Sequence, residues 1–127
     1  MAEADITNPI LKEASRMGAR LFRQNVALAW VGKQIKRTPT TITLENPRPL
    51  HAGLCKGSSD VIGWTPVLVT PEMVGQTLAV FTAIEVKAGR VPVTEEQERF
   101  VAAVVAAGGI GRVVRSVAEA VAALRRE

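Results

Sequence analysis

The feature that most constrains the fold is the apolar, β-branched segment Thr77–Lys87, which reads TLAVFTAIEVK. β-branched and aromatic residues favour strands, and the length of this segment predicts the central strand of a sheet. A turn is expected at Ala88–Pro92. The following helix begins at a capping box, with Thr94 at the cap and Gln97 three residues later, and is predicted to run to about Ala107. A strand followed closely by a helix favours an α/β fold.

The remaining elements are expected from capping signals and periodicity. Asn8-Pro9 combines an N-cap residue with a proline at the first helical position, so the first helix is predicted to begin at Pro9. In chain order the elements are a helix Pro9–Arg20, a strand Leu21–Val31, a basic loop Gly32–Pro49 with a short strand at Thr41–Leu44, a strand Val61–Trp64, a strand Gly111–Arg115 and a helix Val117–Arg126.

The apolar side chains of these elements are expected to fill the core. In the helices, the excess of valine and alanine could also form a subunit contact. The expected core residues are Trp30, Trp64, Val101, Val104, Val105, Val117, Val121 and Leu124.

Length and composition exclude several classes of protein. The chain has 127 residues, which predicts one domain spanning residues 1–127. No apolar run is long enough for a membrane span, and no secretory pattern is seen at the start. One cysteine and one histidine exclude a disulfide framework, a multi-cysteine zinc site and a histidine-rich metal site. Any metal is therefore expected to bind carboxylates and carbonyls, which favours Mg²⁺, Mn²⁺ or Ca²⁺.

The charge is unevenly distributed along the chain. Residues 1–56 contain nine basic and four acidic side chains, whereas residues 57–127 contain seven basic and eight acidic ones. A basic half favours a polyanionic partner, because lysine and arginine release counterions when they neutralise phosphates. An ordinary solvated surface is the alternative.

Two acidic groups and a lysine are expected at one edge of the sheet. Glu85 and Lys87 are two residues apart on the central strand, so their side chains share a face. Asp60 stands at the mouth of the strand Val61–Trp64, and the three charges converge if the strands are neighbours. Two carboxylates and a backbone carbonyl, such as that of Val86, suit Mg²⁺. The metal would acidify a water beside a phosphate, with Lys87 assisting. An ordinary salt bridge at a strand end is the alternative.

Three segments together resemble the VRR-NUC family, a branch of the PD-(D/E)XK nuclease superfamily. They are KGSSDVIGW at Lys56–Trp64, FTAIEVKAGR at Phe81–Arg90 and TEEQERFV at Thr94–Val101. The resemblance extends to the first helix, to Arg20–Trp30 and to Ala106–Val121. It implies a mixed central sheet flanked by helices and hydrolysis of phosphodiester bonds with Mg²⁺ or Mn²⁺.

The resemblance also implies a role for particular residues. Asp60 and Glu85 match the metal ligands, Lys87 the catalytic lysine, and Gln97 a glutamine near the catalytic centre. Glu13 matches an acidic residue of the first helix that often completes such sites. Ser59 stands where the superfamily motif has proline. Gln97 has an alternative role as the capping partner of Thr94.

Small phage-type members of the family look like homodimers that cut branched DNA such as four-way junctions. We therefore expect a homodimer in the cytoplasm of a bacterium or of its phage-infected host. A non-catalytic nucleic-acid-binding module, a structural subunit of a larger assembly and a flap or restriction-type nuclease are the alternatives. The candidate DNA contacts are Arg20, Arg23, Lys33, Lys36, Arg37, Lys56, Ser58, Ser59 and Arg90, and for the two serines a role in the turn is the alternative.

Overall fold

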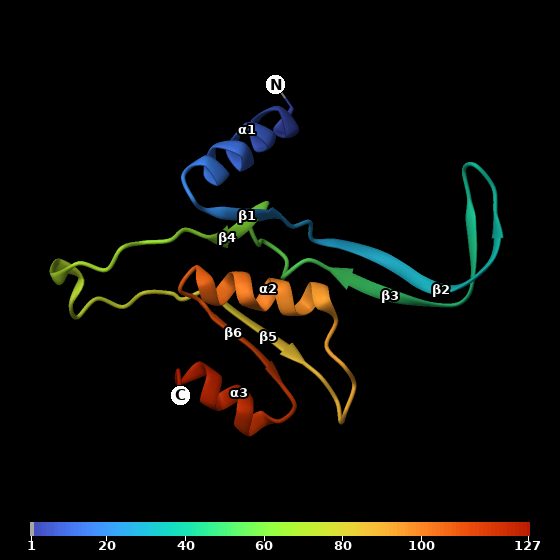
Figure 1. Ribbon diagram of the computed structural model, residues 1–127. Helices are drawn as coiled ribbons and strands as arrows, with labels where there is room; N and C mark the ends of the chain where they lie inside the picture. Colours follow the sequence, from blue (N-terminus) through green and yellow to red (C-terminus); the bar gives the residue numbers. More distant parts are fainter. Residues whose placement is uncertain (1) are drawn as a thin grey trace. The chain divides into compact units, whose positions relative to one another are not determined.

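The computed structural model describes residues 2–127 as an α/β chain (Figure 1). Its elements are, in order, α1 (Glu3–Arg16), β1 (Arg20–Arg23), β2 (Ala27–Arg37), β3 (Ile42–Ala52), β4 (Val61–Trp64), the 3₁₀ helix η1 (Pro71–Met73), β5 (Thr82–Val86), α2 (Glu95–Ala106), β6 (Ile110–Val114) and α3 (Val117–Leu124). Within these described residues, no helix has the length and apolar character that a membrane span requires.

Internal contacts divide the chain into two compact units, which we describe separately. Residues 1–20 together with 63–127 form one of them, here called the βαβ unit, and residues 21–62 form the hairpin unit. The βαβ unit contains ten basic and ten acidic side chains, whereas the hairpin unit contains six basic and two acidic ones. The whole net charge of the chain, +4, therefore belongs to the hairpin unit.

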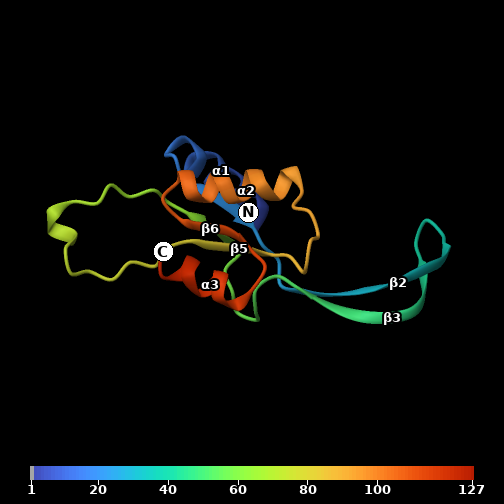
Figure 2. The same cartoon turned by 60° about the horizontal axis from the view of Figure 1, so that its bottom comes forward.

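The βαβ unit is built on β5, α2 and β6. The two strands pair in parallel, with Thr82 opposite Ile110 and Val86 opposite Val114. Parallel neighbours need a long crossover connection, and α2 provides it. Figure 2 shows α2 and α3 on opposite sides of this strand pair.

The core of the βαβ unit lies between the strand pair and its helices. Val104 of α2, Val114 of β6 and Ala123 of α3 are its buried apolar residues. Gly111 allows β6 to approach α2, because an added Cβ would lie 2.8 Å from the carbonyl oxygen of Val101. The core is smaller than predicted, since four of the core residues expected in this unit are exposed: Val105, Val117, Val121 and Leu124.

In residues 2–127 the strands form three two-stranded sheets, which pair β1 with β4, β2 with β3, and β5 with β6. The expected central strand Thr77–Lys87 is a strand only at Thr82–Val86. β-branched composition favours any extended backbone, but a strand also needs a neighbour for its hydrogen bonds. The α/β class is confirmed, and a single mixed central sheet is not seen in residues 2–127.

The hairpin unit contradicts the prediction of a loop at Gly32–Pro49. β2 and β3 are antiparallel strands of eleven residues each. Gly32 lies where the register shifts, and an added Cβ there would be 2.8 Å from the carbonyl oxygen of Glu45. Asn46 adopts the left-handed conformation, with a φ of 50°. Pro47 and Pro49 are tolerated because a two-stranded hairpin has outer edges whose N–H positions need no partner.

Large apolar side chains are exposed along the hairpin. Trp30, expected in the core, is 57% exposed, and Leu28, Ile35, Ile42 and Leu50 are also exposed. The two strands of the hairpin unit supply no second layer of their own to cover these side chains, which is consistent with the exposure.

The bounds of the first helix and of the first two strands differ from the predicted ones. α1 starts at Glu3, six residues before Pro9, which lies inside the helix. The Ala2 N–H donates to Asp5 Oδ2 at 2.9 Å, and acidic residues in the first turn favour this start. The single strand expected at Leu21–Val31 is split between β1 and β2.

Candidate active site

The candidate site lies at the carboxyl end of β5. Glu85 and Lys87 are two residues apart, so strand alternation places both side chains on one face. Lys87 Nζ lies 3.4 Å from Glu85 Oε1, and the two side chains are 14% and 30% exposed, respectively. The Lys87 N–H donates to the Val114 carbonyl at 3.0 Å, which fixes the backbone of Lys87 against β6. The pair is therefore a partly buried ion pair on a hydrogen-bonded strand end.

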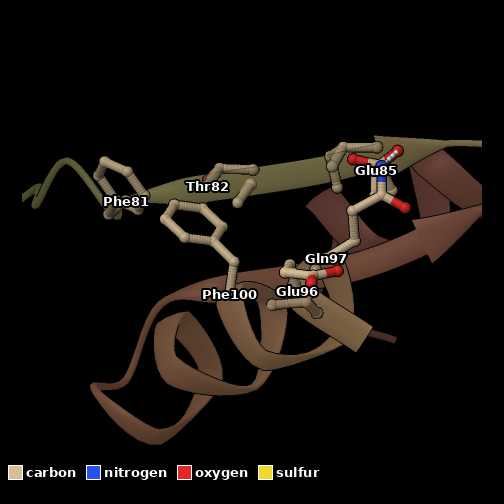
Figure 3. A pocket seen from close by; sticks show the side chains of 9 residues that line it. Phe81, Thr82, Glu85, Glu96, Gln97 and Phe100 are labelled. Atoms are coloured by element: carbon tan, nitrogen blue, oxygen red, sulfur yellow. Dashed lines mark hydrogen bonds between the residues drawn. The ribbon is translucent and has the colours of Figure 1, made fainter. Parts of the chain in front are cut away.

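Gln97 joins this pair from the first turn of α2 (Figure 3). Its Nε2 donates to Glu85 Oε1 at 2.8 Å. Its Oε1 accepts the Thr94 N–H at 3.0 Å, and its own N–H donates to Thr94 Oγ1 at 3.2 Å. One side-chain amide thus closes the capping box and holds the carboxylate of Glu85. The two roles that the sequence left as alternatives are compatible.

The two contacts of Glu85 both use the same oxygen. Both the Gln97 hydrogen bond and the 3.4 Å approach of Lys87 are to Oε1, so neither is made through Oε2. A carboxylate oxygen held in place but not engaged by these contacts is a suitable ligand for Mg²⁺ or Mn²⁺, which prefer oxygen donors. The chemistry of Glu85 therefore fits one position of the implied metal site.

A groove of about 540 Å³ runs along β5 and α2 beside this carboxylate. Figure 3 shows Phe81 and Phe100 toward one end and Glu85 and Gln97 toward the other. The groove therefore has an apolar end and a polar end.

Trp64 extends the aromatic cluster of the βαβ unit. Its ring centroid lies 4.9 Å from that of Phe81 and 6.2 Å from that of Phe100. Arg20 Cζ lies 5.7 Å from the centroid of the Trp64 ring, within reach of a cation–π interaction. Arg20, a predicted DNA contact, therefore has a role within the unit as well.

Asp60 lies in the hairpin unit, in an exposed turn before β4. Gln24 organises this turn: its Nε2 donates to Ser58 Oγ at 2.7 Å and to the Ser59 carbonyl at 2.6 Å. The Gln24 N–H also donates to the Asp60 carbonyl at 2.9 Å. Ser58 thus has the structural role in the turn that the sequence offered as its alternative. No local signal identified Gln24, because its partners are 30 or more residues away.

The convergence of Asp60 with Glu85 stays a prediction, because they belong to different units. Across residues 2–127, no group of three or more histidine, cysteine, aspartate or glutamate side chains is arranged to hold a metal ion. Glu13 forms an exposed ion pair with Arg16, with Oε2 and Nη1 2.8 Å apart. The structure therefore brings Glu85, Lys87 and Gln97 together and places Glu13 in a local pair.

The predicted DNA contacts lie mainly on exposed positions of the hairpin unit. Lys33, Lys36 and Arg37 are on β2 rather than in a loop, and Arg23 and Lys56 are also exposed. Arg90, in the βαβ unit, is exposed in the turn after β5.

Comparison with known families shows the family of this chain. The model of the VRR-NUC domain matches residues 32–118, which include Asp60, Glu85, Lys87 and Gln97. The chain belongs to the VRR-NUC family. The match excludes Glu13 and Arg20, so it covers less of the chain than the resemblance suggested. No curated protein and no solved structure matches the chain significantly.

Membership of the VRR-NUC family implies a nuclease of the PD-(D/E)XK type, with DNA as its substrate. Nucleases of this type generally use a divalent metal. The Glu85 and Lys87 pair at the end of β5 therefore lies in a chain whose family carries out phosphodiester hydrolysis.

Proposed function

We propose that this chain is an endonuclease that uses Mg²⁺ or Mn²⁺ to hydrolyse phosphodiester bonds in branched DNA, such as four-way junctions. The observation that carries the proposal is the cluster of Glu85, Lys87 and Gln97, which lies inside the span matched by the family. A lone Glu-x-Lys pair recurs by chance on strands. A glutamate held by both a lysine and a helix-capping glutamine has a more specific geometry.

Each residue of the cluster has a proposed role. Glu85 Oε2, the Val86 carbonyl and Asp60 would hold the metal, with Glu13 as an accessory acid. When bound, the metal supplies charge neutralisation at the phosphate and lowers the pKa of water. Lys87 orients the attacking water and stabilises the negative charge that develops on the phosphate. Gln97 holds the carboxylate of Glu85 in one orientation, so its role is positioning.

The hairpin unit supports binding to the DNA backbone. It contains the whole net charge of +4, and its lysines and arginines are exposed. Contacts to phosphates fix the position of a protein on DNA without reading sequence. We assign this contact to Arg23, Lys33, Lys36, Arg37 and Lys56, and propose Ser58, Ser59, Arg20 and Arg90 as further contacts.

A homodimer suits a branched substrate, because two-fold symmetry supplies two active sites for two strands. The exposed apolar residues of α2 and α3 are the surface that we propose for the subunit contact. From the resemblance to small phage-type family members, we propose that the activity lies in the cytoplasm of a bacterium or of its phage-infected host.

The test is a panel of end-labelled four-way junctions, flaps, splayed arms and plain duplex, each incubated with Mg²⁺, Mn²⁺ or EDTA. With Mg²⁺ or Mn²⁺, we expect four-way junctions to be cut faster than plain duplex. In sedimentation analysis, the protein should be a dimer. If flaps are cut faster than junctions, the proposed substrate is wrong, and the proposed metal-dependent hydrolysis stands. Binding without cutting under every metal condition would identify a non-catalytic binding module and overturn the proposal.

A further inference from the structure

Arg115, which lies between β6 and α3, contacts the turn that follows β5. Its Nη1 donates to the Gly89 carbonyl at 2.7 Å, and its Nη2 donates to the Val91 carbonyl at 2.8 Å. These carbonyls belong to the residues on either side of Arg90. The planar guanidinium fork therefore holds the turn that follows the Glu-x-Lys pair at two points, a geometry that a single ammonium cannot reproduce.

The main chain of Arg115 is itself anchored. Its N–H donates to Glu119 Oε2 in the first turn of α3, and the Glu119 N–H donates to Ser116 Oγ at 3.2 Å. The preceding residue, Val114, is buried in the core of the βαβ unit. The guanidinium therefore extends from a fixed point.

The turn that Arg115 holds contains Arg90, a candidate DNA contact, and directly follows Lys87 of the proposed site. The Lys87 N–H donates to the Val114 carbonyl, and the turn closes through the Val91 N–H, which donates to the Ala88 carbonyl at 3.1 Å. The neighbouring residues Val114 and Arg115 thus restrain both ends of the short segment from Lys87 to Val91.

We propose that Arg115 is a positioning residue of the nuclease: it clamps the turn 88–91 so that the Lys87 ammonium and the Arg90 guanidinium stay in the positions that cleavage requires. The expected effect of Arg115 on the cleavage rate rests on the proposed function. The clamp itself is independent of any activity. Arg115 does not need to touch the substrate.

The test uses Arg115→Ala and Arg115→Lys, with Arg112→Ala as the matched control. Arg112 lies on β6, three residues before Arg115, and its substitution removes the same charge. Its Nη2 donates to the Glu127 carbonyl rather than to the turn. The first readout is the rate of tryptic cleavage after Arg90, followed by mass spectrometry. The second is kcat and KM on a labelled four-way junction.

We expect Arg115→Ala to speed cleavage after Arg90 by at least about fivefold, because the turn opens locally more often. We also expect kcat to fall by about 10- to 100-fold, since small displacements of positioned groups are costly, with KM changed by less than about threefold. Arg115→Lys should recover part of both effects, and Arg112→Ala should change neither.

An unchanged cleavage rate after Arg90 in Arg115→Ala would overturn the clamp, whatever the nuclease activity. If Arg115→Ala does not fold, Arg115→Lys decides the question by the same two readouts. Faster cleavage after Arg90 with an unchanged kcat would overturn the positioning role. If the wild-type chain cuts no DNA, the proposed function fails, and the proteolysis result alone decides whether Arg115 holds the turn.

Discussion

The two units of this chain differ in how their charges are used. In the βαβ unit, basic and acidic side chains are equal in number, and Glu85 is held by Lys87 and Gln97 at fixed distances. In the hairpin unit, basic side chains outnumber acidic ones three to one, and those of β2 are exposed. Chemistry requires a few groups in one geometry, whereas binding to a phosphate backbone requires many exposed charges. The comparison predicts that mutations in the two units affect different steps.

The largest effects are expected from the site residues of the βαβ unit, and Lys87→Ala tests the lysine. Because Lys87 is proposed to act on the attacking water and the developing charge, kcat should fall by about 10²- to 10⁴-fold. The affinity for a four-way junction, measured in EDTA by fluorescence anisotropy, should change by less than about threefold. Retained turnover would remove Lys87 from the mechanism and would break the division between the units.

The triple variant of Lys33, Lys36 and Arg37 to alanine tests the hairpin unit. Junction binding should weaken, and the slope of log K against log salt should become smaller by about 2 to 3, since each lost phosphate contact removes about 0.9. The kcat at saturating DNA should stay near that of the wild type. A salt slope equal to that of the wild type would show that the hairpin does not bind the DNA backbone.

Metal affinity tests whether the two units share one function. Asp60→Asn and Glu85→Gln should each weaken Mn²⁺ binding by about 10-fold or more in calorimetry, because each removes a proposed charged ligand. Glu72→Gln is the control, since Glu72 is an exposed acid of η1. If Asp60→Asn binds Mn²⁺ as tightly as the wild type, Asp60 is not a metal ligand.

The smallest effect is expected from the capping residues. Thr94→Ala removes a cap and should cost about 1 kcal/mol of unfolding free energy. Gln97→Ala removes the reciprocal cap and the contact with Glu85, and should cost about 1–2 kcal/mol and lower kcat as well. Thermal unfolding and single-turnover rates measure the two quantities. Equal kcat values for the two variants would show that the contact of Gln97 with Glu85 has no role in cleavage.

Local signals in the sequence were sufficient for much of the βαβ unit. The bounds of β4 agree with the prediction, and α2 begins after the Thr94 cap and ends before Gly108, as its capping signals indicated. The shared face of Glu85 and Lys87 follows from the two-residue period of a strand. These features depend on residues within one or two turns of each other.

The failures have a common physical cause, which is dependence on partners distant in sequence. The prolines and charges of Gly32–Pro49 are typical of a loop, but backbone pairing across the hairpin makes two long strands of them. Gln24 and Arg115 were not identified, because the partners of each lie more than 20 residues away. No neighbouring residue in the sequence indicates that a glutamine or an arginine will hold a distant turn through its side chain.

The most direct test of the central claim is metal-dependent cleavage of a labelled four-way junction by the wild type and by Glu85→Gln. Because Glu85 is the proposed ligand held by Lys87 and Gln97, its loss should reduce the cleavage rate by at least about 10³-fold, with the fold intact by circular dichroism. Cleavage by the wild type should stop in EDTA and return with Mn²⁺. Cleavage by Glu85→Gln at the rate of the wild type, or cleavage by the wild type in EDTA, would contradict the account.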